Sequence, residues 1–292
     1  MSGPAGSPRL ASIHIYPLKA GRAVDLAESV VEPWGLAGDR RWLVVDSDGR
    51  FVSQREEPAL ARVIAAYPAA GTDRARGPGP ASTLTLSADG NPPLAVRVPS
   101  AGDPAEMVPV AVWRSEICAA AAGKEADEWL SDFLGRTVRL VYLDDPTRRK
   151  VDQDYGAPDD PVSFADGYPV LLTSTGSLEE LGRWLTDDGH PPVPMNRFRP
   201  NVVVAGAPPW SEDGWRRIRI GSITFRVVKP CGRCQVTTID QATAQRGRQP
   251  LTMLGRRRRF GQQLVFGQNM IPHARGSIRV GDAVQVLERS GP

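Results

Sequence analysis

Short stretches in which apolar and polar residues alternate run along most of this chain. A period of two is typical of β-strands with one buried face, and Gly, Asp or Pro separates most of the stretches. Two pairs of stretches predict hairpins, one turning at Asp48-Gly49 and one at Gly221-Ser222. The predicted strands cover residues 10–16, 41–46, 51–54, 83–87, 94–98, 108–113, 138–143, 198–205, 217–220 and 223–228, with two short strands within 276–287.

Only a few segments have the period of a helix. Residues 125–134 place four apolar side chains on one face at i, i+1, i+4 and i+5, and Gly135 ends the pattern. A second helix is expected to begin with Ser177 as its N-cap, because Glu180 three residues later completes a capping box. Many short strands and few helices predict a mainly β protein of the α+β class, built from barrels.

One long segment has the composition of a linker. Residues 144–162 are polar and rich in Asp and Pro, which predicts a domain boundary. We therefore expect one domain over residues 8–145 and a second over residues 146–290. Residues 71–81 have the composition of a surface loop.

Composition and charge narrow the function. The net charge of +3, from 36 basic and 33 acidic residues, is too balanced to indicate a nucleic-acid-binding protein. The sequence has no apolar run near the ~20 residues of a membrane helix and no signal peptide, so we expect a cytoplasmic protein. No G-x-G-x-x-G after a strand and no Walker motif occurs.

The segment from Lys229 to Cys234 carries the most distinctive chemistry. It holds Cys231 and Cys234, two of the three cysteines, with Arg233 between them. A thiolate beside fixed positive charge is a nucleophile or a metal ligand. The β-branched residues 236–239 favour a strand directly after Cys234.

Several interpretations of this cysteine pair remain open from the residues alone. The thiols could simply pack in the core, bind zinc, form a redox dithiol or act with a histidine in a hydrolase. Zinc normally takes four ligands, but Cys118 and the three histidines are scattered. A dithiol of this kind sits at a helix N-terminus, and here a strand is expected. The last alternative is a thiolate ligand to a metal such as molybdenum, carried by an anionic cofactor that arginines would hold.

Six motifs, in order along nearly the whole chain, resemble those of MOSC-domain proteins, which are named for the C-terminal domain of molybdenum cofactor sulfurases. Within that superfamily the chain is most similar to the mitochondrial amidoxime-reducing component and its bacterial relatives, which carry an N-terminal β-barrel-like domain. The motifs are Ile15-Tyr-Pro-Leu-Lys19, Gly38-Asp-Arg-Arg-Trp-Leu-Val44, Phe164-Ala-Asp-Gly-Tyr-Pro169, Phe198-Arg-Pro-Asn201, Cys231-Gly-Arg-Cys-Gln-Val-Thr-Thr-Ile-Asp240 and Phe266-Gly-Gln268.

The resemblance implies a cofactor cleft between the two domains. Cys234 is the implied ligand of molybdenum in a molybdopterin cofactor, and Cys231 is an implied neighbour without that role. The cofactor-binding residues implied by the same motifs are Lys19, Arg40, Gly167, Tyr168, Arg199, Arg233 and Asn269.

The resemblance also implies a reaction. The family reduces N-hydroxylated substrates such as amidoximes and hydroxylamines at molybdenum. Three cysteines are too few for a four-cysteine iron–sulfur cluster, so a separate ferredoxin, flavoprotein or cytochrome is the expected electron donor. The basic run Arg256–Arg259 is a solvated loop or a docking patch for that donor. The alternatives are a molybdopterin carrier or sulfur-transfer protein without reductase turnover, and a hydrolase or transferase with Cys234 as nucleophile.

Overall fold

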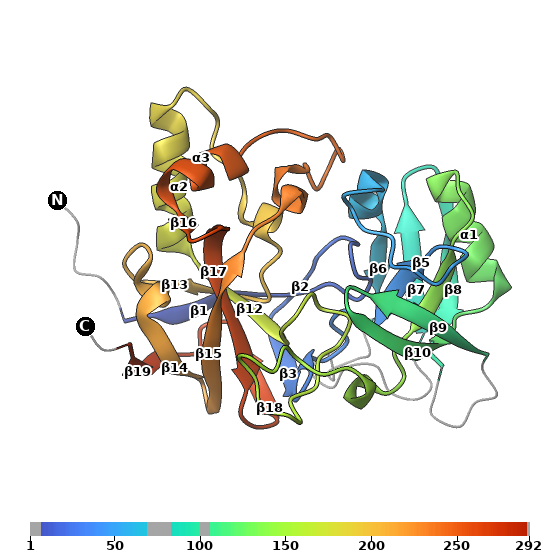
Figure 1. The fold of residues 1–292 in the computed structure, drawn as a ribbon, viewed down its shortest axis with the longest axis horizontal. Coiled ribbons are helices and arrows are strands. Elements are labelled where there is room, and N and C mark those ends of the chain that lie inside the picture. Colours follow the sequence, from blue (N-terminus) through green and yellow to red (C-terminus); the bar gives the residue numbers. More distant parts are fainter. Residues whose placement is uncertain (1–6, 69–82, 100–105, 291–292) are drawn as a thin grey trace.

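β-Strands make up most of the regular structure in the computed structural model, which describes residues 7–68, 83–99 and 106–290 (Figure 1). This confirms the mainly β, α+β class expected from the sequence. The predicted loop at 71–81 lies outside the described residues. The strands are β1 (Arg9–Ile15), β2 (Val24–Leu26), β3 (Glu28–Glu32), β4 (Gly35–Leu36), β5 (Trp42–Val45), β6 (Ile64–Ala66), β7 (Thr83–Ala88), β8 (Asn91–Arg97), β9 (Met107–Val112), β10 (Ser115–Ala121), β11 (Arg139–Tyr142), β12 (Val170–Ser174), β13 (Val202–Ala205), β14 (Trp215–Ile220), β15 (Ile223–Gly232), β16 (Arg259–Phe260), β17 (Gln263–Pro272), β18 (Gly276–Arg279) and β19 (Val284–Arg289). The helices are α1 (Lys124–Leu134), α2 (Thr175–Asp187) and α3 (Leu251–Arg257).

The largest sheet joins strands from both ends of the chain. Its order is β19-β14-β15-β17-β12-β13-β1-β2, with β16 paired to β17. Strands β3 and β4 similarly form a smaller sheet with β18. The division of the chain at residue 146 stays a prediction. Strands β1 to β4, which precede that residue, pair in sheets with strands that follow it. The first and last strands therefore lie on the same side of the molecule (Figure 1).

Alternation along the strands explains the core of this large sheet. In β14, Trp215, Ile218 and Ile220 are buried while the residues between them are exposed, as one covered face requires. Strands β12 and β13 are instead buried almost continuously, and they pair in parallel through the crossover helix α2. A helix over the second face of a sheet produces such a continuous apolar run.

The N-terminal part forms a second core beside the large sheet (Figure 1). One sheet has the order β5-β11-β10-β9 and another the order β6-β7-β8. Helix α1 buries Ala126, Trp129 and Leu130 in a core shared with β5, β6, β7, β8 and β11, so the predicted amphipathic helix is confirmed. Gly135 ends α1 in the left-handed conformation, at a φ of 66°.

The second predicted helix exists, but its predicted start is wrong. Helix α2 begins three residues earlier, and Ser174 is the N-cap whose hydroxyl accepts a hydrogen bond from the Ser177 amide at 3.1 Å. The Ser177 hydroxyl instead donates to the buried Glu212 carboxylate at 2.6 Å. The capping-box pattern therefore predicted Ser177 in place of Ser174 as the N-cap, because the Ser177 hydroxyl is hydrogen-bonded to Glu212, a residue distant in sequence.

Both predicted hairpins are confirmed, with changes in length. Strands β14 and β15 turn at Gly221-Ser222, and β5 pairs with Phe51 through a turn at residues 46–50. The strand predicted over 198–205 is shorter than expected, because Phe198 ends a 3-10 turn and Arg199 adopts a left-handed conformation before β13 begins.

A glycine in β17 provides a test of this architecture. Gly267 has a φ of +83°, and an added Cβ would lie 2.6 Å from the Leu172 carbonyl oxygen on β12. We expect Gly267→Ala to lower the free energy of unfolding by roughly 2–3 kcal/mol, from backbone strain plus overpacking. Gly261→Ala is the matched control, because its φ is +58° and nothing lies within 4 Å. Chemical denaturation of both variants measures the difference, and equal losses would contradict the proposed close contact.

Within these described ranges, no helix is both long enough and apolar enough to cross a membrane.

Candidate functional site

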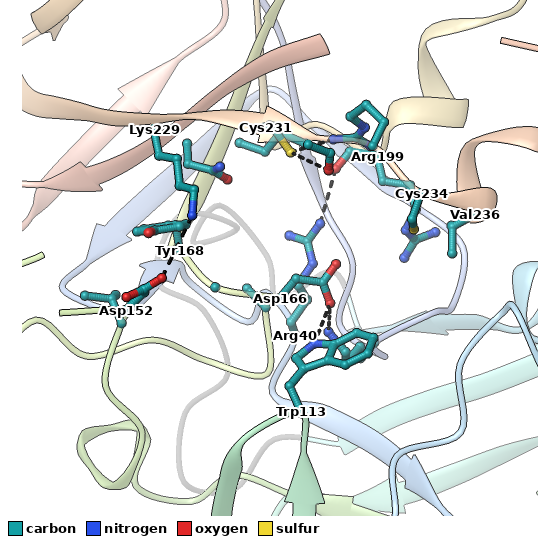
Figure 2. A pocket seen from close by; sticks show the side chains of 18 of the residues that line it. Arg40, Trp113, Asp152, Asp166, Tyr168, Arg199, Lys229, Cys231, Cys234 and Val236 are labelled. Carbon is teal, nitrogen blue, oxygen red and sulfur yellow. Dashed lines mark hydrogen bonds and ion pairs between the residues drawn. The ribbon is translucent and has the colours of Figure 1, made fainter. Parts of the chain in front are cut away.

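A cavity of about 870 Å³ lies between the two cores and is lined by residues from both halves of the chain (Figure 2). All eight residues that the sequence motifs singled out line this one cavity: Lys19, Arg40, Gly167, Tyr168, Arg199, Arg233, Cys234 and Asn269. In Figure 2, Cys231 and Cys234 lie across the cavity from Trp113. The fold therefore assembles segments more than 200 residues apart in sequence into one site.

The structure contradicts the strand predicted after Cys234. Residues Gln235–Thr238 form a 3-10 turn that begins directly after this cysteine. The Thr237 hydroxyl donates to the Cys234 carbonyl oxygen at 2.9 Å, and the Thr237 amide donates to the same oxygen at 3.1 Å. Threonine hydroxyls thus complete a local turn that competes with a strand. Cys234 is exposed two residues after the end of β15, and it lines the cavity.

Cys231 has a more direct basic partner than its neighbour does. The Arg233 guanidinium donates from Nη1 to the Cys231 sulfur at 2.8 Å and from Nη2 to the Phe198 carbonyl oxygen at 2.5 Å. The described residues provide no side-chain hydrogen bond to the Cys234 sulfur. Arg233 therefore places its positive charge beside Cys231, whereas Cys234 is the more open thiol.

Arg40 is held rigidly at the wall of the cavity. Its Nη1 atom donates to the fully buried Asp39 carboxylate at 2.5 Å and to the Asn201 side chain at 3.1 Å, and its Nη2 atom donates to the Arg199 carbonyl oxygen at 3.2 Å. Burial opposes the charge of Arg40, but Asp39, Tyr16 and Asp166 together outweigh it, and the net effect raises the pKa of Arg40. The guanidinium is a fixed positive charge.

Arg199 is a buried cation with unused hydrogen-bonding capacity. Its Nη1 atom donates to the Gly21 carbonyl oxygen at 2.8 Å and to Gln241 at 3.1 Å, and its guanidinium lies 4.2 Å from the Tyr16 ring centroid. The Nη2 atom is buried and has no partner among the described residues. Burial lowers the pKa of Arg199 to about 10, so it stays charged at neutral pH. A charged, unsatisfied donor at a cavity is a candidate anion-binding group.

Lys19 meets a carboxylate within the cavity. Its ammonium group is 2.5 Å from Asp166 Oδ1 and 4.8 Å from the Phe51 ring centroid. Burial lowers the pKa of Lys19 to about 8, and the Asp166 charge offsets only part of this effect. The positive charges of Lys19 and Arg40 hold the pKa of Asp166 well below its usual range.

The lowered pKa of Lys19 predicts pH-dependent anion binding. Lys19 is protonated below about pH 8 and neutral above it, so an anion should bind best below that pH. We expect the affinity for sulfate, whose charge is constant here, to fall about fivefold between pH 7 and pH 9 as one charge-assisted hydrogen bond is lost.

Isothermal calorimetry on cofactor-free protein measures this affinity. Lys19→Arg is the matched control, because arginine stays charged across the range and should remove the pH dependence. The same sulfate affinity at both pH values in the native sequence would contradict a binding role for Lys19.

Arg149 is a site residue that sequence reasoning missed. It lies in the predicted boundary segment but is only 4% exposed, and burial lowers its pKa to about 10. Its guanidinium donates to the carbonyl oxygens of Ser163, Ala165 and Asp166. Arg149 therefore fixes the backbone that presents Asp166, and nothing local in the sequence distinguishes it from the many other arginines.

Three further predicted residues line the cavity with few contacts. Gly167 has nothing within 4 Å of an added Cβ. The Tyr168 hydroxyl is buried without a partner among the described residues, and burial followed by the nearby charge of Asp152 raises its pKa. Asn269 lies on β17, and its side-chain amide nitrogen donates to the Pro230 carbonyl oxygen at 3.5 Å.

Two of the sequence alternatives find no matching geometry in the described part of the chain. No group of three or more His, Cys, Asp or Glu side chains there is placed to hold a metal ion. No histidine lines the cavity: His14 contacts Ser12 and Asp25, and His190 contacts Asp188. A cysteine–histidine nucleophile therefore has no base within the cavity.

The basic run Arg256–Arg259 is not a uniform patch. Arg258 is 7% exposed and pairs with Asp213 at 2.6 Å, and Arg256 pairs with Asp188 at 2.8 Å. Arg257 and Arg259 are exposed and form no ion pair with any described residue. Within this run, these two are the exposed arginines whose charge no described carboxylate already pairs.

Comparison with known proteins agrees with this two-part site. Residues 7–137 match the MOSC N-terminal beta barrel domain, and residues 159–285 match the MOSC domain. The chain is 31% identical to mitochondrial amidoxime-reducing component 1 of Mus musculus and 30% identical to that of Homo sapiens, in each case over 95% of this chain and 82% of the relative. It is also 30% identical to the molybdenum cofactor sulfurase of Danio rerio, over 84% of this chain but only 30% of that protein.

A chain with both domains in this order is a MOSC-domain protein. It belongs to the family that includes the mitochondrial amidoxime-reducing components, as the motifs had indicated. Its function is accordingly associated with the molybdenum cofactor.

Proposed function

We propose that this protein is a molybdenum-cofactor oxidoreductase that reduces N-hydroxylated substrates of the amidoxime or hydroxylamine type. The observation that carries the proposal is the cavity in which the open thiol of Cys234 faces cations from other segments, above all the largely buried Arg40 and the buried Arg199. A soft sulfur ligand beside fixed positive charge suits a metal held by an anionic organic ligand.

The residues present fit a molybdopterin. Arg199 Nη2 and Arg233 Nε are buried donors without partners among the described residues, as expected for groups that complete their hydrogen bonds with a ligand. Gly167 leaves room at the cavity wall, where a larger side chain would project. Cys234 offers one thiolate as the protein ligand, and Lys19, Arg40 and Arg199 offer the charge that a phosphate requires.

When bound, the cofactor would supply two-electron oxygen-atom transfer chemistry. The chain's own contribution is to hold and shield the reacting groups. Asp39 and Asn201 fix the Arg40 guanidinium, and Arg149 fixes the backbone of residues 163–166. These contacts are formed before any ligand binds, so little reorganisation is needed at the moment of reaction.

Metal and pterin analysis with a turnover assay tests the proposal. Protein from a cofactor-competent host should contain about one molybdenum and one pterin per chain, as one thiolate ligand implies. It should also reduce an amidoxime with a chemical electron donor. Protein that contains neither molybdenum nor pterin would overturn it.

A cofactor carrier or sulfur-transfer protein is the second candidate. Two observations favour it: the likeness to molybdenum cofactor sulfurase, and a second thiol, Cys231, held by Arg233 in the same cavity. Bound pterin without reduction of amidoximes or hydroxylamines would support this alternative over the reductase.

We propose a separate protein as electron donor, of ferredoxin, flavoprotein or cytochrome type. Arg257 and Arg259 are the members of the basic run that could dock its acidic surface. Turnover with a protein donor should then fall with rising ionic strength, whereas turnover with a neutral chemical donor should not.

A further inference from the structure

The turn between β9 and β10 holds a tryptophan in a conformation that large side chains rarely adopt. Val112 pairs with Ser115, so Trp113 and Arg114 form a two-residue hairpin turn. Trp113 has a φ of 57°, whereas Arg114 has no positive φ. This pattern is that of a turn whose first central position normally carries glycine. A bulky residue at such a position often marks a functional constraint.

The indole is fixed by three neighbours at the cavity. Its Nε1 atom donates to Asp166 Oδ1 at 3.3 Å, and its ring meets Phe51 edge-on, with centroids 5.7 Å apart. The Arg55 guanidinium lies 4.6 Å from the Trp113 ring centroid. Despite these contacts Trp113 is 51% exposed and lines the cavity (Figure 2).

The carboxylate beside the indole is only half used. Oδ1 of Asp166 accepts both the Lys19 ammonium and the Trp113 indole N–H. Oδ2 accepts no hydrogen bond from any described residue, and the Asp166 side chain is 77% accessible. An ionised carboxylate oxygen is therefore open beside a flat aromatic surface.

We propose that Trp113 and Asp166 form a substrate-selecting subsite for planar, aromatic N-hydroxylated amidines. The indole would lie against the substrate ring, and Asp166 Oδ2 would accept a hydrogen bond from the amino group next to the N-hydroxyl. Substrates without a ring would lose the first contact, and N-oxides without an N–H would lose the second. This inference rests on the proposed reductase function and names the substrates that the site prefers.

Binding of two amidoximes to Trp113 variants tests the inference. Benzamidoxime and acetamidoxime share the same head group, and only the first has a ring. We expect Trp113→Ala and Trp113→Gly to weaken the binding of benzamidoxime about tenfold and the binding of acetamidoxime less than about twofold, because only the stacking contact is lost. Trp113→Phe should retain most of the preference. Calorimetry on the purified protein measures both affinities, and kcat/KM with a chemical donor should follow the same ratio.

Trp113→Gly separates selectivity from folding. Glycine suits a φ of 57°, so this variant should keep a melting temperature within a few degrees of the parent while it loses the preference. Arg114→Ala, which keeps the indole in the same turn, should leave both affinities unchanged. Equal weakening of the two amidoximes, or unchanged binding of both, would overturn the subsite. Absence of turnover in the parent protein, with the binding preference intact, would instead overturn the reductase function alone.

Discussion

Replacing Cys234 by alanine is expected to leave a folded protein that no longer retains molybdenum. The thiol is exposed at the cavity and has no side-chain hydrogen bond among the described residues, so its removal costs little packing or hydrogen bonding. Mutating a residue that only hydrogen-bonds to a metal ligand typically lowers the affinity for the metal about 10- to 100-fold. Loss of the ligand itself should therefore lower molybdenum content and turnover by at least about 100-fold. Elemental analysis after gel filtration measures the first effect, and amidoxime reduction with a chemical donor measures the second.

Cys231→Ser is the matched control for this prediction. It alters a thiol three residues away in the same cavity, whose sulfur already accepts a hydrogen bond from Arg233. We expect this variant to retain molybdenum, with at most a modest loss of turnover. The reverse outcome, in which Cys231→Ser loses the metal and Cys234→Ala keeps it, would show that Cys231 and not Cys234 is the metal ligand.

Replacing Arg199 by leucine is expected to release the pterin while the protein still folds. The change removes a buried positive charge and the unpartnered Nη2 donor, and each charge-assisted hydrogen bond to a phosphate is worth about 1.5–3 kcal/mol. Pterin content after gel filtration should therefore fall about tenfold or more. The Gly21 carbonyl oxygen and Gln241 also lose a donor, which should lower the free energy of unfolding by about 1–3 kcal/mol.

Arg199→Lys distinguishes charge from geometry at this position. Lysine keeps the charge but lacks the planar guanidinium that reaches Gly21, Gln241 and a ligand together. We expect an intermediate pterin content. Full pterin retention in Arg199→Leu, at matched protein stability, would show that Arg199 has only a structural role.

Local patterns succeeded where neighbouring residues in sequence determine the outcome. The strand at the start of the chain, the α1 helix and the hairpin at Gly221 were all predictable, because alternation, amphipathic spacing and turn residues act over a few positions. The helix start at Ser174 and the turn after Cys234 were not predictable in this way. Glu212 recruits the Ser177 hydroxyl from 35 residues away. The turn after Cys234 is local, but the hydrogen bond from the Thr237 hydroxyl to the Cys234 carbonyl oxygen competes with the strand that the β-branched residues favour.

The sequence by itself determined the mainly β class and the family, and its motifs singled out eight residues that prove to line one cavity. Only the tertiary structure decided what each residue contacts. It directed Arg233 toward Cys231, buried Arg149 behind Asp166, left one Arg199 donor without a partner among the described residues, and placed Trp113 at the cavity. The physical reason is that burial and hydrogen-bond partners depend on segments far apart in the chain, whose meeting no local pattern encodes.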